Sequence, residues 1–274
     1  MNEAALSPSA EQRGDGAPGD YARRIEEASL RAWPALTESD FDGWRLRFAD
    51  GYTRRANSIT PLGPSRLDLG DKVATCERLY AERGLPAIFR VTPFAPPGLE
   101  AILAARGYTR GDQVEVRARD LRATPVPATP ARPLDASSVR LWDLPLDRWL
   151  EVFASLSGSS DANRAPHRRV LAAVPGRRRL LALAVDSRPV ACGMSVLSDG
   201  LLGMFDLVTA RDSRGRGFGS EILRRALRWG GRAGAEAAYL QVLERNGVAC
   251  RLYQRAGFEV VYRYHYREPP EALR

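Results

Sequence analysis

The sequence predicts an α+β protein in which a mixed central sheet is flanked by helices, with two such domains in tandem. Three strand-like runs between residues 178 and 210 are separated by the turn signals Asp186–Pro189 and Ser198–Gly200, a pattern typical of an antiparallel meander. A glycine-rich segment, a helix, a strand, a second helix and a last strand follow. A similar order of elements occurs earlier in the chain, which indicates the second copy.

The chain of 274 residues divides at "ATPVPATPARP", residues 123–133, where repeated prolines favour an extended spacer. We therefore expect one domain over residues 21–122 and a second over residues 134–274. Residues 1–20 are polar and contain several glycines and prolines, and we expect them to form a disordered lead-in.

The predicted C-terminal domain begins with the strand-like "SVRLWDL" and two helical stretches, Leu146–Ala154 and Ala165–Val174. The meander comes next, and a helix is expected over Ser220–Gly231. "AAYLQV" has the length of a short strand, and "NGVACRLYQRAG" predicts a helix capped by Asn246 at its start and by Gly257 at its end. "FEVVYRYHYRE", with tyrosines at every second position, closes the domain as a long strand.

The N-terminal half repeats part of this plan. Without gaps, "NSITPLGPSRLDLG" (residues 57–70) aligns with "DLVTARDSRGRGFG" (residues 206–219), which puts Gly70 opposite Gly219. Each segment then continues into a helix, a strand, a second helix and a last strand. This agreement in order and spacing favours a duplicated fold over the alternative that any two αβ segments look alike.

The net charge is +8 and comes almost entirely from arginine, because Lys72 is the only lysine. A basic surface attracts a nucleic acid or a phosphorylated cofactor equally well. The arginines are scattered, however, and the aromatic residues do not alternate with them as they would in a stacking platform for bases. The sequence therefore does not favour a nucleic-acid partner.

The three cysteines are far apart in the sequence, and with only two histidines they lack the spacing of a zinc site. We expect no metal.

No uncharged apolar run approaches the roughly 20 residues of a membrane span, and the start of the chain lacks a basic-then-apolar signal pattern. These features predict a cytoplasmic protein without a membrane partner. We expect it to be a monomer or a homodimer.

The glycine-rich segment "RDSRGRGFGSE", residues 211–221, lies between an apolar strand and a helix. Amide groups in the first turn of a helix are unpaired and the helix dipole favours negative charge there, so this is a general anion site. Arg214 and Arg216 add positive charge, and the glycines let the backbone approach a phosphate. The segment lacks the Gly-Lys-Ser/Thr of a P-loop and the G-x-G-x-x-G spacing of a dinucleotide site.

Arg214-x-x-Gly217-x-Gly219 resembles the Gln/Arg-x-x-Gly-x-Gly/Ala loop of the GNAT superfamily of N-acetyltransferases. "NGVACRLYQRAGF" (residues 246–258) is similar to the superfamily's N-x-x-A-x-x-L-Y-x-x-x-G-F segment. The resemblance is clear over about residues 137–268 and implies the GNAT fold there, with a GNAT-like copy before it. It also implies that the protein is an N-acetyltransferase, an acyltransferase with acetyl-CoA as its co-substrate.

The resemblance also assigns residues to acetyl-CoA. In the superfamily the loop amides hold the pyrophosphate, and the end of the preceding strand pairs with the pantetheine arm. By carry-over, the cofactor-binding residues are Leu207, Val208, Thr209, Arg214, Gly215, Arg216, Gly217, Phe218, Gly219 and Asn246. Asn246 is equally a plain helix cap, and the two roles can coexist. Tyr253 occupies the superfamily position of the acid that protonates the departing thiolate, with a core tyrosine as the alternative.

Amine acetylation also needs a base that takes a proton from the attacking amine. Asp206 is the only charged residue inside "LLGMFDLVT", and on a regular strand it shares one face with Met204 and Val208. Asp206 is therefore the candidate base, and a structural role in the strand is the alternative. Glu244 is a weaker candidate, and many enzymes of the superfamily use water to relay the proton.

The N-terminal copy lacks the loop, because Ser65 stands opposite Arg214 and Asp68 stands opposite Gly217. A carboxylate at this position disfavours a pyrophosphate, so we expect this copy not to bind CoA. We expect it to pack on the active half and to shape or cover the acceptor groove, with "DGWRLRFADGYTRRANS" (residues 42–58) supplying exposed arginines and aromatic residues. The alternative is that this half only stabilises the fold.

The function predicted is direct transfer of acetyl from acetyl-CoA to a primary amine within a ternary complex. The acceptor is a small-molecule amine or an amine of a peptide or protein. The alternative is a non-catalytic acyl-CoA sensor or interaction module, which would bind CoA without acetylating any amine.

Overall fold

The computed structural model describes residues 19–123, 125–129, 134 and 138–271. Most of the predicted lead-in, residues 1–18, and part of the predicted spacer, residues 124 and 130–133, lie outside the described residues. The helices and strands in chain order are α1 (Asp20–Ala32), β1 (Thr37–Phe41), β2 (Trp44–Phe48), β3 (Ile59–Pro61), α2 (Leu69–Ala81), β4 (Phe89–Val91), α3 (Leu99–Ala105), β5 (Thr109–Arg110), β6 (Val114–Asp120), β7 (Val139–Asp143), α4 (Leu146–Ser157), α5 (Arg164–Ala172), β8 (Arg177–Val185), β9 (Arg188–Ser198), β10 (Leu201–Thr209), α6 (Phe218–Arg232), β11 (Ala237–Leu243), α7 (Gly247–Arg255) and β12 (Glu259–Glu268).

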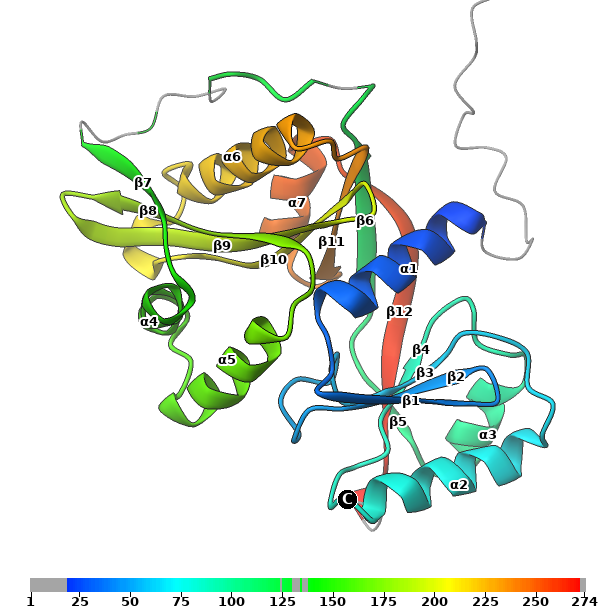
Figure 1. Ribbon diagram of the computed structural model, residues 1–274. Coiled ribbons are helices and arrows are strands. Elements are labelled where there is room, and N and C mark those ends of the chain that lie inside the picture. Colours follow the sequence, from blue (N-terminus) through cyan, green and yellow to red (C-terminus); the bar gives the residue numbers. More distant parts are fainter. Residues whose placement is uncertain (1–18, 124, 130–133, 135–137, 272–274) are drawn as a thin grey trace, which may run out of the picture.

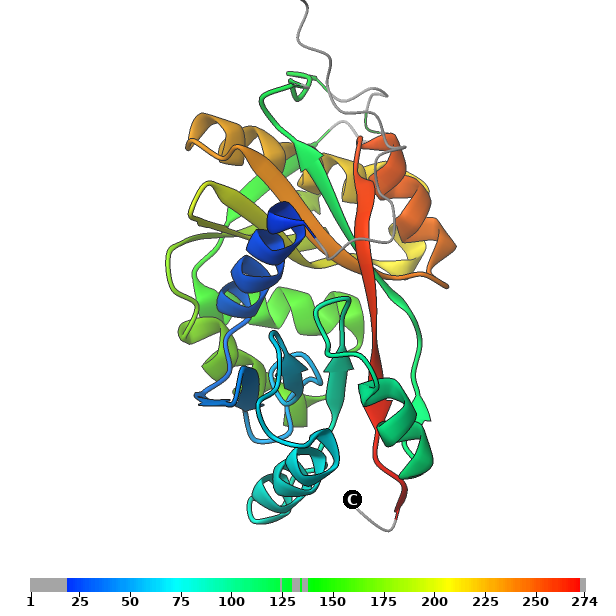
Figure 2. The ribbon, with the colours of Figure 1, turned by 90° about the vertical axis from the view of Figure 1, so that its right-hand side faces the viewer.

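All twelve described strands belong to one mixed sheet, in the order β1-β2-β3-β4-β12-β6-β11-β10-β9-β8-β7, with β5 paired to β12. Strand β6 comes from the N-terminal half, yet it lies between β11 and β12 of the C-terminal half. The long strand β12 continues past β6 and pairs with β4 and β5 of the N-terminal half. The two predicted domains therefore share one sheet through exchanged strands, which Figures 1 and 2 show as the green and red strands between the two parts.

The predicted meander is present as β8, β9 and β10, paired antiparallel in sequence order. Both connections are tight turns in which consecutive residues have positive φ, at Asp186–Ser187 and at Asp199–Gly200. Such turns match the right-handed twist of a hairpin, and Asp-Gly is among their preferred sequences. Local turn chemistry thus fixes this part of the sheet.

Helices cover both faces of the C-terminal part of the sheet. Helix α6 packs on β8, β9 and β10 from one face, and its apolar side enters a core that also includes Tyr253 of α7 and Phe258. Helix α4 packs on the same three strands from the other face, beside α5 and α1 (Figure 1). No element was predicted over residues 20–32, although α1 packs on β9 and β10 on this second face.

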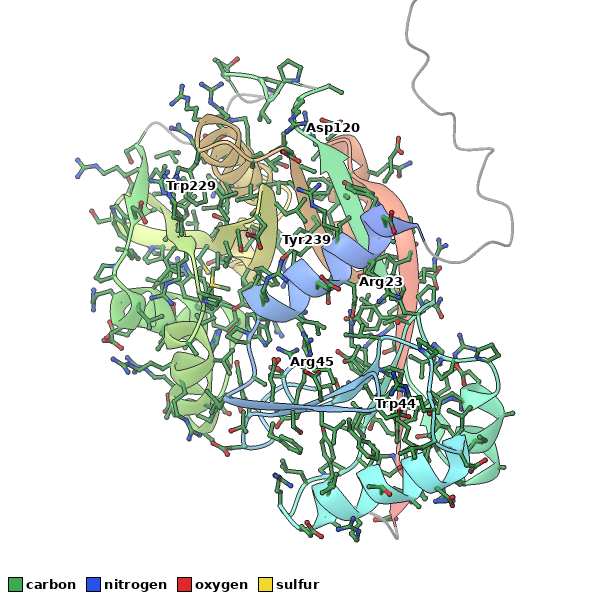
Figure 3. All side chains as sticks on the ribbon, turned by 45° about the vertical axis from the view of Figure 1, so that its right-hand side comes forward. Arg23, Trp44, Arg45, Asp120, Trp229 and Tyr239 are labelled. Atoms are coloured by element: carbon green, nitrogen blue, oxygen red, sulfur yellow. The ribbon has the colours of Figure 1, made fainter. Side chains whose placement is uncertain are left out.

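The N-terminal part of the sheet, β1–β4, carries α2 and α3 on one side. Trp44 of β2 is fully buried in this separate core with Val73 and Cys76 of α2 (Figure 3). Helix α2 begins at Leu69 and α6 at Phe218, the same distance of 149 residues (218 − 69) that the internal alignment predicts. The arginines of residues 42–58 are not uniformly exposed, because Arg47 is fully buried and donates to backbone carbonyls.

Candidate active site

The sheet opens where β10 and β11 part. Their parallel pairing begins at Leu201 and ends at Met204, which lies opposite Leu240. Beyond that point, within the described residues, β10 pairs only with β9, at Phe205, Val208 and Thr209. The edge of β10 that faces β11 is therefore open along its last residues. An open strand edge can pair with the amide groups of an extended ligand.

A β-bulge interrupts β10 between Phe205 and Val208, and Asp206 within it has a φ of +49°. Bulges re-aim a side chain, and positive φ at a residue other than glycine is a strained conformation found often at functional sites. The bulge corrects one expectation. Asp206 does not share a face with Met204, which packs toward α6. It lies with Phe205 and, as expected, with Val208 on the face of α1, α4 and α5.

Asp206 contacts a buried histidine. Nε2 of His167, on α5, lies 2.9 Å from Oδ2 of Asp206, and the histidine side chain is 3% exposed. The imidazole ring stands among four aromatic rings at centroid distances of 5.0–6.2 Å, those of Trp33, Tyr52, Trp149 and Phe153. This cage fixes the ring, so His167 holds one carboxylate oxygen in a set direction.

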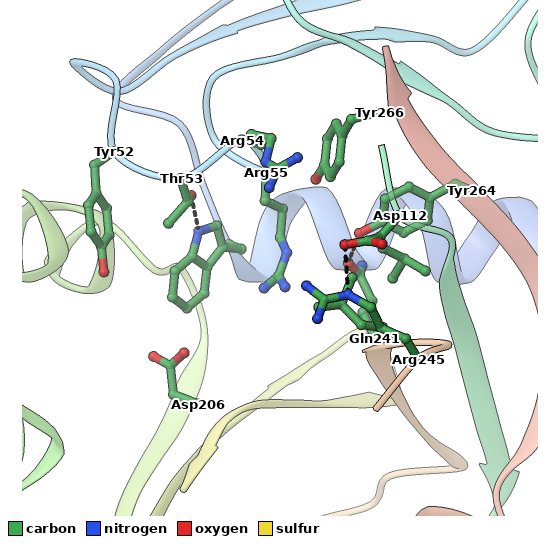
Figure 4. A pocket seen from close by; sticks show the side chains of 13 residues that line it. Tyr52, Thr53, Arg54, Arg55, Asp112, Asp206, Gln241, Arg245, Tyr264 and Tyr266 are labelled. Carbon is green, nitrogen blue, oxygen red and sulfur yellow. Dashed lines mark hydrogen bonds and ion pairs between the residues drawn. The ribbon is translucent and has the colours of Figure 1, made fainter. Parts of the chain in front are cut away.

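Asp206 lines a cavity of about 310 Å³ between the two halves of the chain. Figure 4 shows its carboxylate pointing into this space, opposite the loop that carries Tyr52, Thr53, Arg54 and Arg55. The remaining lining residues are Trp33, Asp112, Val114, Gln241, Leu243, Arg245, Tyr264 and Tyr266. The structure thus places part of residues 42–58, predicted to shape the acceptor groove, opposite the candidate base.

The glycine-rich loop after β10 has the backbone of an anion cradle. Gly215 and Gly217 have φ of +77° and +88°, and Gly217 is the N-cap of α6 without a side-chain cap hydrogen bond. Gly219 lies close to the strand end, since a Cβ there would stand 3.1 Å from Oγ1 of Thr209. Arg214 is exposed, and the Arg216 guanidinium lies 5.2 Å from the centroid of the Phe218 ring. The strand end and the loop predicted to bind acetyl-CoA are therefore adjacent.

The corresponding helix of the N-terminal half is closed by its own side chain. Asp68, the N-cap of α2, accepts hydrogen bonds from the amides of Gly70 and Asp71 at 2.8 and 3.1 Å. A shift of 149 residues turns these two amides into those of Gly219 and Ser220. The same position in the fold thus has occupied amides in one half and amides without a side-chain cap in the other.

Tyr253 and Asn246 both lie on the segment of α7. Tyr253 is 9% exposed and packs with Phe258 in the core on the α6 face, outside the cavity lining. Burial, with a smaller effect of the nearby Cys250, raises the pKa of the Tyr253 phenol to about 12. The Asn246 side chain accepts from the Ala249 amide at 3.2 Å, so it caps α7 as predicted.

Glu244, the second candidate base, is placed differently from Asp206. Its side chain is 53% exposed and lies 3.5 Å from Nε of Arg263. Glu244 is also not among the residues that line the cavity. The geometry therefore favours Asp206, which faces the cavity, over Glu244, which faces an arginine on the outside.

His167 was not among the site residues predicted from the sequence. Helix α5 buries His167, Val170 and Leu171, which recur at the spacing of a single helix face. A histidine on an otherwise apolar face was the available signal. Its partner Asp206 is 39 residues away in the chain, so nothing local indicated the pair.

No group of three or more His, Cys, Asp or Glu side chains in the described ranges is arranged to hold a metal ion. None of the helices described here is long and apolar enough to cross a membrane.

Comparison with known families and sequences gives a consistent result. A model of the family described as "Probable histone acetyltransferase Rv0428c C-terminal" matches residues 21–267. The "Uncharacterized N-acetyltransferase YobR" of Bacillus subtilis is 28% identical over 253 residues, 90% of this chain and 98% of that protein. The "Probable histone acetyltransferase Rv0428c" of Mycobacterium tuberculosis is 32% identical over 131 residues, 48% of this chain and 38% of that protein.

Solved structures share the fold. A GCN5-related N-acetyltransferase from Kribbella flavida superposes with a TM-score of 0.65 at 18% identity, covering 91% of this chain and 95% of that one. A tandem GNAT protein from the clavulanic acid biosynthesis pathway has a TM-score of 0.62 at 17% identity, with coverage of 94% and 90%. At these identities the likeness shows the GNAT fold alone.

Proposed function

The chain belongs to the family described as "Probable histone acetyltransferase Rv0428c C-terminal" and is a GNAT-type N-acetyltransferase, and we propose that it transfers acetyl directly from acetyl-CoA to a primary amine. The uncapped first turn of α6, beside the open end of β10, carries this proposal. We further propose that the acceptor, a small molecule or an amine of a peptide or protein, enters through the cavity at Asp206.

Different residues of the chain bind acetyl-CoA and transfer the protons of the reaction. The loop from Arg214 to Gly219 binds the pyrophosphate through backbone amides, and Leu207–Thr209 pair with the pantetheine arm. Acetyl-CoA supplies the thioester whose carbonyl carbon the amine attacks. As the C–N bond forms and the C–S bond breaks, Asp206 accepts the amine proton and the Tyr253 phenol protonates the thiolate. His167 keeps the Asp206 carboxylate pointed at the cavity.

The N-terminal half is proposed to be a degenerate GNAT-like copy that does not bind CoA. The Asp68 carboxylate already occupies the two amides that a phosphate would need, and its negative charge repels an anion. This half instead contributes the loop of Tyr52–Arg55 to the acceptor cavity.

Gly217→Asp tests the acetyl-CoA site by placing a carboxylate at the position that Asp68 occupies in the N-terminal half. We expect acetyl-CoA affinity, measured by calorimetry, to fall by about 10²-fold, because the new carboxylate competes for the loop amides and repels the pyrophosphate. Gly217→Asn is the matched control, since asparagine tolerates positive φ and has the same shape without the charge. It should lose less affinity than Gly217→Asp. Unchanged affinity in Gly217→Asp would show that the pyrophosphate binds elsewhere.

Tyr253→Phe tests the thiolate acid. We expect kcat to fall by about 10²-fold, because no donor then protonates the leaving thiolate, while the Kd of acetyl-CoA stays as in the parent protein. Burial raises the Tyr253 pKa to about 12, so the phenol keeps its proton at pH values at which an exposed tyrosine is already ionised. The parent kcat should therefore show no alkaline decline near pH 10 from this group. Full turnover in Tyr253→Phe would leave the tyrosine with a packing role only.

A further inference from the structure

We infer that the acceptor carries a carboxylate as well as the reacting amine, and that Arg55 binds this carboxylate in the cavity. The inference rests on the proposed function, because it takes the cavity at Asp206 as the acceptor site. The acceptor class that follows is an amino acid or another small amine with a nearby carboxylate.

The charges of the cavity lining are mostly compensated. Arg245 lies 2.8 Å from Asp112, and both side chains are at the exposed rim. Arg54 forms an ion pair with Glu268 at 2.5 Å. With these pairs set aside, the charged side chains that remain in the lining are Arg55 and Asp206.

Among the described residues, Arg55 has no acidic partner. Its guanidinium lies 5.1 Å from the ring centroid of Trp33 and 5.7 Å from that of Phe205. In the part of the chain that the structure describes, its buried Nε has no hydrogen-bond acceptor and no carboxylate pairs with it. A buried donor left unpaired is unfavourable, so this side chain is suited to bind an acceptor group from outside.

A second unpaired donor lines the same cavity. The Oε1 atom of Gln241 accepts a hydrogen bond from the Tyr264 hydroxyl at 2.7 Å, and this contact does not use the Nε2 amino group of Gln241. Within the described residues this buried Nε2 has no acceptor. Arg55, on the loop after β2, and Gln241, of β11, thus line one cavity from two separate segments (Figure 4). A carboxylate, with two acceptor oxygens, matches such a set.

The loop that carries Arg55 is held in place before any ligand arrives. The Asn57 side chain accepts from the amides of Ala49 and Gly51 and donates to the carbonyls of Tyr52 and Thr53. The buried Arg47 guanidinium donates to the carbonyl of Arg55 itself at 2.6 Å. A loop fixed this way loses little conformational freedom on binding, which favours a preorganised site.

The two remaining charges match a zwitterion. The ammonium or amine of an amino acid would face the Asp206 carboxylate, and its carboxylate would face the Arg55 guanidinium. Both charges act on the Tyr52 side chain, because Asp206 adds to the burial that raises the Tyr52 pKa while Arg55 lowers it. A volume of about 310 Å³ is at the lower end for ligand pockets and suits a small acceptor better than a folded substrate.

The test is a panel of the common amino acids, each assayed beside its α-carboxamide, with CoA thiol release as the readout. For the best acceptors of the parent protein we expect kcat/KM to be about 10–100-fold higher for the acid than for the amide, since a charge-assisted hydrogen bond is lost in the amide. Arg55→Met should bring this ratio close to one, mainly by raising KM for the acids. Arg31→Met removes an exposed arginine from outside the cavity and should keep the parental ratio.

A binding measurement makes the result independent of turnover. We expect calorimetry to show that N-acetyl amino acids bind the parent protein more tightly than the matched N-acetyl amides, and that Arg55→Met removes the difference. Equal binding of acid and amide by the parent, or an unchanged acid preference in Arg55→Met, would overturn the carboxylate site. If the parent protein neither bound acetyl-CoA nor acetylated any amine, the proposed function would be contradicted. The calorimetry with acids and amides would still show whether Arg55 binds a carboxylate.

Discussion

Replacing Asp206 with asparagine is expected to lower kcat/KM by about 10²–10⁴-fold and to leave acetyl-CoA affinity unchanged. Asparagine keeps the shape of the side chain and tolerates the φ of +49° at this position, but it cannot accept a proton from the amine. The asparagine side chain can also keep the hydrogen bond with His167. The substitution therefore tests the loss of the base alone. Initial rates of CoA release and acetyl-CoA calorimetry measure the two quantities.

A matched control exists in the same domain. Asp186, in the turn between β8 and β9, has a φ of +48°, and Asp186→Asn makes the same chemical change at a site away from the cavity. Its turnover should equal that of the parent protein. If Asp206→Asn kept full turnover while Glu244→Gln lost it, the base would be Glu244. If neither variant lost turnover, water would relay the proton.

Replacing Arg90 with methionine is expected to lower the free energy of unfolding by about 3–5 kcal/mol, because it leaves a buried carboxylate without its cation. Arg90 of β4 forms an ion pair with Glu26 of α1, and both side chains are fully buried. The Arg90 guanidinium also lies 3.8 Å from the centroid of the Tyr264 ring, and the Tyr262 hydroxyl donates to Glu26. The pair therefore joins α1, β4 and the shared strand β12.

Denaturant unfolding followed by circular dichroism measures this effect. The double variant Arg90→Met with Glu26→Leu should lose less stability than Arg90→Met alone, since no unpaired charge remains buried. Arg31→Met breaks an ion pair with Asp199 whose side chains are 42% and 66% exposed, and it should change the unfolding free energy by less than about 1 kcal/mol. A small effect for Arg90→Met would mean that water reaches the Glu26 carboxylate.

Elements with strong local signals were predicted well. The meander of β8–β10, the helix from Phe218 to Arg232 and the capped helix after Asn246 all appear close to their predicted bounds. Their signals were turn residues, glycine spacing and a capping side chain, each of which acts within a few residues. Helix α1 was not predicted from the sequence. Its buried side packs on strands that lie far away in the sequence.

The candidate site was predicted only in part for the same reason. The motif predicted a role for the loop and the strand end, and this role stays a prediction; the chemistry proposed there depends on backbone shape and consecutive residues. The bulge at Asp206 has no glycine to mark it, so the sequence wrongly placed this side chain on the face of Met204. The contact with His167 joins two segments through a shared aromatic cage, and no short pattern encodes such a contact.

The sequence by itself predicted a strand, a glycine-rich loop and a helix in one half of the chain, which together form the candidate anion site, and it placed Asp68 at the position of Gly217 in the other half. These features depend on backbone conformation within a single turn. Only the tertiary structure decided which strands pair across the halves, where Asp206 points and which arginine of the cavity lining has no acidic partner among the described residues. Those outcomes depend on packing and charge pairing between residues far apart in the chain, so Arg55 is distinguished from Arg54 and Arg245 only in the folded protein.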